Sequence, residues 1–520
     1  MRILQFSILL CAFFGARLHA QTINAASCNS GDVQSALNSV ASDGTIVNIP
    51  AGNCTWKTQV IFNQVYSTVI QGRSTTSGTC APGGTCTATD STIINDEVAG
   101  TGWTFNTAAG KSLRITGITF NPSGATPAYG AITIGGSSTS IRVDHSHFVD
   151  TVSGEHTFQI DQVNGVFDHN VFDSTNSANL FFFQFTDNGA SNYGHESWAQ
   201  PENFGTSKFI YIENNLFQNG AFMFDCFSGG RAVLRFNIVG YNTRIQTHGL
   251  TGDTHRGCRT EEVYGNSFTF SNNPSSNSFA FLVDYEGGNG MWWGNTITGF
   301  VTFLREDVVR TNSDTYSEVA PPAGWGYCSG ASPWDGNVPG QNGWPCLDGI
   351  GRGAGQLLSG CLASSGGACS GVVNTATGTI AWPNEAAVPV YAWANTFNTS
   401  NFAPPHYWSN YDSVSVENRD YYLELPNYDE PQSFNGTAGI GQGKLASKPA
   451  TCTPGVGWWA TDQGTWNQSS NGFGQGELYV CTATNTWTPF YIPYTYPHPL
   501  TQQGGTSPIS PPTNLSATVQ

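Results

Sequence analysis

Seven short segments of this chain share one pattern, in which a leading Asn or Ser is followed by one variable residue and then by Phe, Ile or Val. The gaps between the first six leading residues are 24, 45, 22, 29 and 29. A repeat of about 20 to 30 residues built from short strands is typical of a parallel β-helix. Successive coils stack about 4.8 Å apart, so we expect the Asn side chains to form a column that hydrogen-bonds from coil to coil. The segments are Ser146–Phe148, Asn170–Phe172, Asn215–Phe217, Asn237–Val239, Asn266–Phe268, Asn295–Ile297 and Asn395–Phe397.

The two ends of the chain depart from this repeat. Asp32–Val40 has apolar residues at helical spacing, which predicts a helix that caps the open end of the coil. Near the other end, Trp458-Trp459 and Leu478–Cys481 indicate a small β unit stapled by cysteines. We therefore expect six parts: a signal peptide at 1–20, an N-terminal cap at 21–67, a parallel β-helix at 68–430 with a long disulfide-pinned insertion at 311–380, a small C-terminal β unit at 431–500, and a disordered Pro/Ser/Gly tail at 501–520.

The first 20 residues have the features of a secretory signal peptide. Arg2 precedes an apolar run from Ile3 to Gly15, and Leu18-His19-Ala20 provides a small residue for cleavage. The run is too short to span a bilayer. We therefore expect a secreted protein without a membrane partner.

The cysteine content indicates that the protein folds in an oxidising compartment. The chain has 13 cysteines, and removal of Cys11 with the signal peptide leaves an even number, which in an exported protein suggests disulfides. No C-x-x-C pair occurs, which argues against zinc. We expect six bridges between neighbours in sequence: Cys28–Cys54, Cys80–Cys86, Cys226–Cys258, Cys328–Cys346, Cys361–Cys369 and Cys452–Cys481.

Charge and composition narrow the range of partners. The net charge of −17 makes nucleic acid an improbable ligand and disfavours a polyanionic glycan unless cations bridge it. Charged residues make up only 11% of the chain and aromatics 13%, a composition that suits a polysaccharide or a cell-surface glycan. It equally suits any exported β-solenoid, so composition alone does not identify the ligand.

A second strand in each coil ends in a polar residue, and these residues are the candidates for chemistry. In Phe222-Met223-Phe224, for example, alternation places the first and third residues inward, so the residue that follows faces solvent. Applied to every coil, this rule predicts one exposed stripe, with Glu306 the least regular member because Arg305 interrupts the apolar pattern. The stripe consists of Asp161, Gln184, Asp225, His248, Asp284 and Glu306.

Stacked acids in such a stripe repel one another and shift each other's pKa values, which is how proton-transfer pairs arise. Asp225 and Asp284 are two coils apart, about 10 Å, near the upper limit for the two carboxylates of an inverting glycosidase. His248 lies between them and could orient a water or hold a sugar hydroxyl, and Arg244 shares its strand face. Two other interpretations remain open: the acids cap turns, or Asp161, Asp225 and Asp284 bind calcium.

Aromatic residues near the stripe could stack on the C–H faces of sugars. The candidates are Trp198, Tyr285 and Trp292, although only one of the adjacent Trp292 and Trp293 can point outward from a strand. Trp198 belongs to a long excursion at 185–207. This excursion is either a wall of the binding cleft or a decoration.

The segment Asp43–Gly52, the coil repeats and the Asn motifs resemble the pectate-lyase-like superfamily of right-handed parallel β-helix proteins. Gly229-Gly230-Arg231, His248-Gly249 and Arg256-Gly257 with Arg259 are similar to an exported subgroup of it. The resemblance implies a right-handed coil and cleavage of a polysaccharide by hydrolysis or by β-elimination. Elimination would use His248 or Arg244 as base, with Arg259 or calcium neutralising a uronate. The tandem Asp pair of polygalacturonases is absent from the stripe.

A non-catalytic function is the alternative. Residues 440–500 resemble β elements of phage tail fibres, which favours an adhesin or a tail-spike-like solenoid that only binds glycans. The sequence leaves the sugar open and does not distinguish a monomer from a trimer.

Overall fold

The computed structural model describes residues 21–122, 130–150, 156–174, 181–187, 195–220, 222–240, 243–250, 256–270, 281–308, 327–328, 346–355, 373–374, 379–380, 385–398, 406–410, 414–427 and 429–502. The signal peptide at 1–20, the Cys361–Cys369 pair, most of 311–380 and the tail from 503 onward lie outside the described residues. Within this part of the chain, no helix is both long and apolar enough to cross a membrane.

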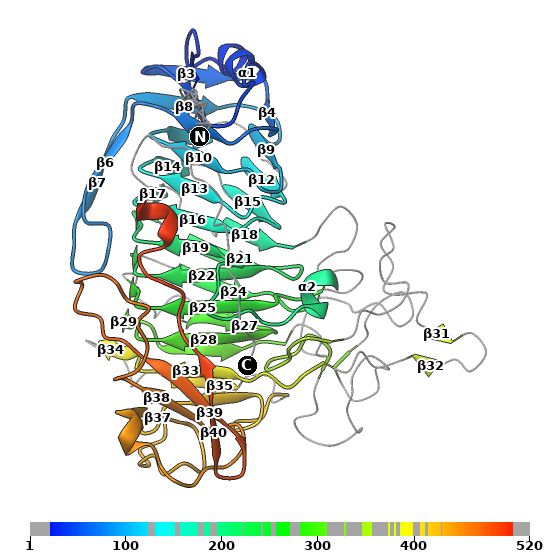
Figure 1. Ribbon diagram of the computed structural model, residues 1–520, viewed down its shortest axis with the longest axis vertical. Helices are drawn as coiled ribbons and strands as arrows, with labels where there is room; N and C mark the ends of the chain where they lie inside the picture. The colour runs from blue at the N-terminus through cyan, green and yellow to red at the C-terminus, as the bar shows by residue number, and fades with distance from the viewer. Residues whose placement is uncertain are drawn as a thin grey trace, which may run out of the picture.

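Three long parallel sheets wind around one core, so the chain folds into the expected parallel β-helix (Figure 1). Sheet A consists, in spatial order, of β1 (Thr22–Asn24), β2 (Thr45–Asn48), β5 (Thr68–Gln71), β10 (Leu113–Thr116), β13 (Ile141–Asp144), β16 (Gly165–Asp168), β19 (Ile210–Glu213), β22 (Arg231–Arg235), β25 (Thr260–Tyr264), β28 (Asn289–Trp293), β33 (Val390–Trp393) and β36 (Tyr421–Leu423).

The other two sheets follow the same order along the axis. Sheet B consists of β3 (Gly52–Trp56), β8 (Thr92–Asp96), β11 (Thr119–Pro122), β14 (His147–Asp150), β17 (Val171–Ser174), β20 (Leu216–Gln218), β23 (Ile238–Val239), β26 (Ser267–Thr269), β29 (Thr296–Thr298) and β34 (Thr396–Asn398). Sheet C consists of β4 (Val60–Asn63), β9 (Trp103–Thr107), β12 (Ile132–Gly136), β15 (Phe158–Asp161), β18 (Phe181–Thr186), β21 (Phe222–Cys226), β24 (Thr243–Thr247), β27 (Phe281–Tyr285), β30 (Thr302–Glu306) and β35 (His406–Asn410).

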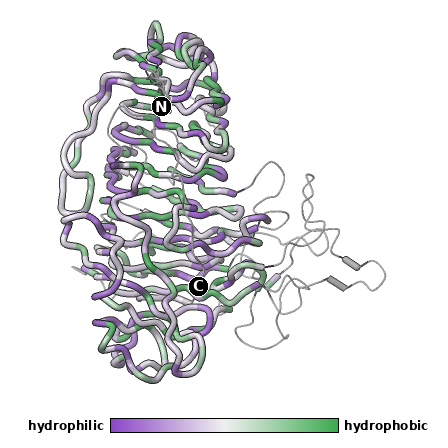
Figure 2. Tube along the Cα trace, viewed as in Figure 1, coloured by the Kyte–Doolittle hydropathy of each residue, from purple (hydrophilic) through white to green (hydrophobic). Residues whose placement is uncertain are grey.

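Alternation along each strand fills the interior with stacked rings. Phe172 and Phe217 stack at 4.4 Å, and Phe183 stacks on both Phe158, at 5.1 Å, and Phe224, at 5.8 Å. Figure 2 shows hydrophobic and hydrophilic residues alternating along the coils. The core is therefore a set of side-chain columns parallel to the coil axis.

The Asn column is confirmed. At each turn from sheet A to sheet B, the Oδ1 atom of an Asn accepts two hydrogen bonds from the Asn one coil earlier. One comes from its backbone N–H and the other from its side-chain Nδ2. For Asn215 and Asn237 both distances are 3.1 Å, and for Asn237 and Asn266 both are 2.9 Å. The ladder runs without interruption from Asn170 to Asn395.

The N-terminal end is closed by the expected helix, α1 (Ser30–Asn38). Its Gln34 exchanges two hydrogen bonds with the backbone of Ile61, which belongs to β4. The Cys28–Cys54 disulfide fixes the approach of the chain to this helix. A short antiparallel hairpin of β6 (Thr75–Gly78) and β7 (Cys86–Thr89) leaves the coil nearby and carries the Cys80–Cys86 bridge.

The C-terminal β unit is also present, as a four-stranded sheet stapled by Cys452–Cys481. Its Trp459 packs against Trp293 at 4.7 Å and Trp393 at 5.2 Å, on the outside of sheet A. The sheet comprises β37 (Ile440–Gly443), β38 (Gly457–Ala460), β39 (Glu477–Ala483) and β40 (Thr486–Tyr491), with η2 (Leu445–Ser447) between its first two strands.

After β40 the chain turns back along sheet A and reaches η3 (Pro499–Gln502), beside β16 (Figure 1). The buried guanidinium of Arg235 donates to the carbonyls of Tyr494 and Thr495 at 2.7 and 3.0 Å, and Glu213 accepts the backbone N–H of His498 at 2.8 Å. This segment therefore covers a buried ion pair between Arg235 and Glu213.

Five of the six expected disulfides are present, including Cys226–Cys258 and Cys328–Cys346, and the sixth lies outside the described residues. Five bridges fit an extracellular protein. The remaining described elements are α2 (His195–Ala199), β31 (Val373–Asn374) and β32 (Thr379–Ile380).

Candidate functional site on sheet C

The strand pairing of sheet C fixes which residues share a column on its outer face. Gln184 pairs with Asp225, Asp225 with Gln246, Gln246 with Asp284, and Asp284 with Arg305. Three members of the expected stripe therefore stand in one column: Gln184, Asp225 and Asp284.

The other three expected members lie elsewhere. His248 and Asp161 face the same side but two residues further along their strands, because Gln246 and Gln159 occupy the column. The placement of Glu306 was wrong: Glu306 pairs with Tyr285, so it points inward, where the backbone N–H of Ser415 donates to it at 3.1 Å. A one-residue slip in register exchanges the two faces of a strand, and the sequence places Arg305 in the column instead.

The expectation of an exposed acidic stripe was also wrong, because the acids are buried beneath cations. The side chains of Asp225, Asp284 and Glu286 are 3%, 0% and 3% exposed, whereas those of Arg244, Arg305 and His248 are 28%, 22% and 20% exposed. The surface of the cluster that solvent reaches is therefore cationic, on a chain whose net charge is strongly negative.

Asp225 lies between two imidazoles. His156 Nε2 is 3.6 Å from its Oδ2, His248 Nδ1 is 3.6 Å from its Oδ1, and Gln184 donates to Oδ2 at 3.0 Å. Burial alone would raise the pKa of Asp225, but the two neighbouring imidazoles, His156 and His248, lower it well below its ordinary value. Asp225 is therefore ionised at neutral pH.

Glu286 stands on the other side of the same imidazole, with Oε2 3.9 Å from His248 Nε2. Gln246 donates to its Oε1 at 2.5 Å and the Gly249 N–H donates to its Oε2 at 2.9 Å. Burial raises the pKa of Glu286, opposed by the charge of His248. Burial lowers the pKa of His248, but the charges of Glu286 and Asp225 outweigh it and raise the value to about 9. The ring of Phe227 packs against His248 at 4.7 Å.

Asp284 forms a second, adjacent group with two arginines. Arg305 donates to its Oδ1 from Nε at 3.2 Å and from Nη2 at 2.9 Å, and Arg244 pairs with its Oδ2. Both guanidinium groups lie over the ring of Phe281, at 5.4 Å for Arg244 and 3.9 Å for Arg305. Burial lowers the pKa of Arg244, and the charge of Arg305 lowers it further. The carboxylate of Asp284 is thus committed to two guanidinium groups.

The aromatic residues that we expected to stack on sugars are not exposed. Tyr285 and Trp292 are buried in the core, where their rings meet at 5.7 Å. Trp198, in α2, is buried too, since its Nε1 donates to the Gly257 carbonyl at 2.9 Å and the guanidinium groups of Arg256 and Arg259 lie over its ring. The three placements were wrong because each ring packs inside the protein instead of facing solvent.

Arg259 does not join the cluster. It pairs with Glu202 at 2.7 Å and donates to the carbonyl of Gln200 at 3.1 Å. Arg231 holds the same stretch through four hydrogen bonds to Ser197, Pro201 and Glu202. The described part of the 185–207 excursion is thus tied to the coils.

The three acids expected to bind calcium do not converge. Asp161 accepts a hydrogen bond from Thr186 at 2.9 Å, while Asp225 and Asp284 stand two coils apart with separate partners. In the described part of the chain, a close group of potential ligand atoms occurs elsewhere, at Asp144, His145 and Asp168.

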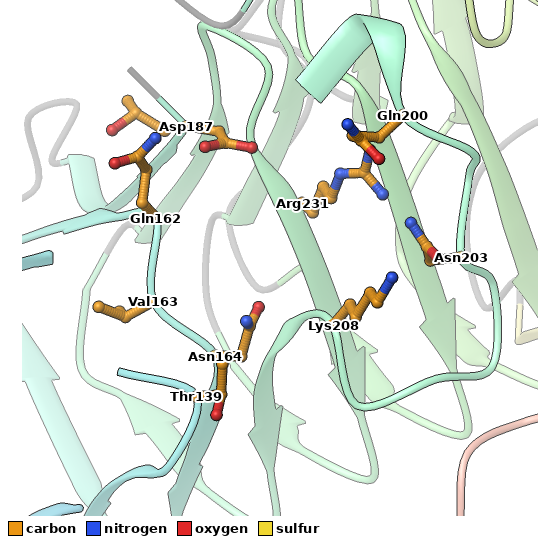
Figure 3. A pocket seen from close by; sticks show the side chains of 10 residues that line it. Thr139, Gln162, Val163, Asn164, Asp187, Gln200, Asn203, Lys208 and Arg231 are labelled. Carbon is orange, nitrogen blue, oxygen red and sulfur yellow. The ribbon is translucent and has the colours of Figure 1, made fainter. Parts of the chain in front are cut away.

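A polar pocket of about 270 Å³ opens next to Asp161, between the ends of the sheet C strands and the segment after α2. Figure 3 shows Arg231, Gln200, Asn203 and Lys208 on one wall, facing Gln162, Asn164 and Asp187. Four primary amides and an exposed lysine can hydrogen-bond to the hydroxyls of a sugar. The complete lining is Thr139, Gln162, Val163, Asn164, Thr186, Asp187, Gln200, Asn203, Lys208 and Arg231.

Sequence reasoning missed five members of the cluster: His156, Phe227, Gln246, Glu286 and Arg305. Glu286 could have been found, because it follows Asp284 by two residues and so continues the same outward face. His156 comes from the coil of β15, and no spacing rule connects it to Asp225.

No protein-family model and no curated protein match this chain. Among solved structures, a PL6 family polysaccharide lyase from Pseudopedobacter saltans is similar, with 14% sequence identity and a TM-score of 0.29. The match covers 58% of this chain and 71% of the lyase. The assignment of the fold rests on the strand pairing described above.

Proposed function

We propose that this protein is an exported carbohydrate-active enzyme of the pectate-lyase-like superfamily, which cleaves a polysaccharide at the outer face of sheet C. One observation carries the proposal: a single imidazole, His248, stands between two buried carboxylates whose pKa values move in opposite directions. Groups whose environments separate their pKa values in this way are typical of acid–base pairs. The division into cap, coil with insertion, C-terminal unit and tail belongs to the same proposal.

Hydrolysis is the reaction that these protonation states favour. Asp225, held ionised, would act as the base that activates water, and Glu286, with its raised pKa, would protonate the leaving oxygen. This assignment replaces the Asp225–Asp284 pair, because Asp284 is held by two arginines. The strands that carry Asp225 and precede Glu286 are two coils, about 10 Å, apart.

An acidic sugar is the substrate class that suits the exposed side of the cluster. Arg244, Arg305 and His248 present three cationic groups to solvent, and Phe281 lies beneath the two guanidinium groups. A carboxylate or sulfate on the sugar would meet these cations despite the negative charge of the whole chain. The pocket at Gln162 and Lys208 would hold a neighbouring sugar of the polymer.

Elimination is the second candidate reaction, and the lowered pKa of Arg244 favours it. An arginine whose charged form is disfavoured by burial and by Arg305 is a better base than an ordinary one. His248 suits the base role poorly, because a pKa of about 9 keeps it protonated at neutral pH. Elimination produces an unsaturated sugar and hydrolysis does not, so the products separate the two reactions.

Binding without cleavage is the remaining alternative, and the internal pairing of Asp284 with Arg244 and Arg305 favours it. A panel of neutral and acidic polysaccharides separates it from catalysis, when reducing ends, unsaturated products and binding are all measured. Release of reducing ends that Asp225→Asn abolishes supports the proposal. Binding by both proteins without any product contradicts it.

A further inference from the structure

Two histidines stack on the turn between sheets A and B, away from the cluster on sheet C. His145 and His169 follow Asp144 and Asp168, which pair with each other between β13 and β16. Their rings are parallel within 2°, with centroids 5.2 Å apart. Their side chains are 42% and 36% exposed. The coil repeat thus places two imidazoles in register at the surface.

Each imidazole is oriented by the carboxylate that precedes it. His145 Nδ1 is 2.7 Å from Asp144 Oδ2, and His169 Nδ1 is 2.9 Å from Asp168 Oδ2. A ring that donates its Nδ1–H to a carboxylate carries its lone pair on Nε2. This carboxylate–histidine arrangement is the one that supports metal-bound histidines in proteins, because it fixes the tautomer and raises the basicity of the ligand.

The carboxylates themselves are committed to arginines. Arg114 donates to both oxygens of Asp144, at 2.8 and 2.6 Å, and Arg142 donates to both oxygens of Asp168, at 2.9 and 2.8 Å. A cation would therefore meet the Nε2 atoms and not the carboxylate oxygens. The two aspartates balance the two arginines, so the base of the site carries no net positive charge.

A nearby histidine shows the contrast. His147 uses both ring nitrogens, Nδ1 on Asp90 at 2.8 Å and Nε2 on Asp173 at 2.9 Å, so it has no nitrogen left for a ligand. His145 and His169 each use only Nδ1 in the hydrogen bonds given above. Unlike those of His147, the Nε2 atoms of His145 and His169 are therefore candidates for binding a ligand.

We propose that His145 and His169 bind a divalent transition-metal ion of the zinc or copper class through their Nε2 atoms, bridging two adjacent coils. Imidazole suits these metals. A zinc–nitrogen distance of about 2.0–2.1 Å requires the Nε2 atoms to approach within about 4 Å, so the exposed rings tilt toward each other. Water completes the coordination. The site is independent of the polysaccharide-cleaving function.

The substitutions that test the site are set by the fold. His145 and His169 have φ values of 49° and 55°, and the next coil has Asn214 at the equivalent position with φ 55°. Asn tolerates this conformation well, so His145→Asn and His169→Asn preserve the turn. His406→Asn is the matched control, because His406 is an exposed histidine beside Asp429 without a stacked partner in the described part of the chain.

Isothermal titration of tag-free protein with Zn²⁺ measures the affinity. We expect about one ion per chain for the wild type and for His406→Asn, and a loss of affinity of at least about tenfold for each of the other two variants, since even loss of a group that only supports a ligand costs about that much. Zinc should also shift the NMR signals of both rings together in the wild type, which needs no variant. Unchanged affinity in either His145→Asn or His169→Asn, or no binding by the wild type, would overturn the proposal.

Discussion

His248 Nδ1 lies 3.6 Å from Asp225 Oδ1, and neither atom has a hydrogen-bond partner among the described residues. The distance is too long for a hydrogen bond but short for two charged groups. On its other side the same ring approaches Glu286 at 3.9 Å. The imidazole is therefore held between the two acids by charge.

The first prediction concerns the protonation of His248. Burial lowers its pKa, and the charges of Glu286 and Asp225 raise it to about 9, so Glu286→Gln should bring the pKa down toward the ordinary value of about 6.5. NMR titration of the imidazole signals measures this directly. An unchanged titration in Glu286→Gln would mean that the two groups do not interact.

The second prediction concerns stability against pH. The folded-state pKa of His248 is about 9, above its unfolded value of about 6.5, so its contribution is fully present below about pH 6.5 and is lost as pH rises through about 9. His248→Gln removes this contribution. Thermal unfolding between about pH 6 and 10 should therefore show a steeper alkaline loss for the wild type than for the variant. Parallel curves would contradict the assignment.

The third prediction concerns the Asn ladder. Asn237 accepts two hydrogen bonds from Asn215 and donates to Asn266 and to the Ile212 carbonyl. Asn237→Ala leaves several buried polar groups without partners and should lower the free energy of unfolding by on the order of 3 kcal/mol. Chemical denaturation measures the loss. The exposed Asn398 provides a control, since Asn398→Ala should change stability by less than about 0.5 kcal/mol.

The fourth prediction compares two disulfides. Cys226–Cys258 closes a loop with a sequence separation of 32, whereas Cys80–Cys86 has a separation of 6. The loop-entropy model gives losses of about 4 and about 2 kcal/mol on replacement of each pair by serine. Replacement of Cys226 and Cys258 should also reduce turnover, because the Cys258 N–H donates to the carbonyl of His248 at 2.7 Å. Equal stability and full activity in both variants would refute this ranking.

The sequence predicted the coil and the Asn column because both follow from one repeat. It also placed Gln184, Asp225 and Asp284 in one column. It failed at Glu306, where a change of one residue in register turned the side chain inward. Burial could not be predicted either, since the depth of Asp225 depends on His156 and His248 from other coils. Local periodicity defines a face, but contacts between distant coils decide its chemistry.

The most direct test of the account is the turnover of acidic polysaccharides by the wild type, Asp225→Asn and Asp96→Asn. Asp96 is a matched control, because it is buried in sheet B, with a pKa raised by burial to about 6, and lies in the N-terminal coils. We predict reducing ends without unsaturated products, a loss in kcat of at least about a hundredfold for Asp225→Asn, and nearly full activity for Asp96→Asn. Equal turnover in all three proteins would contradict the assignment of Asp225 and the site on sheet C.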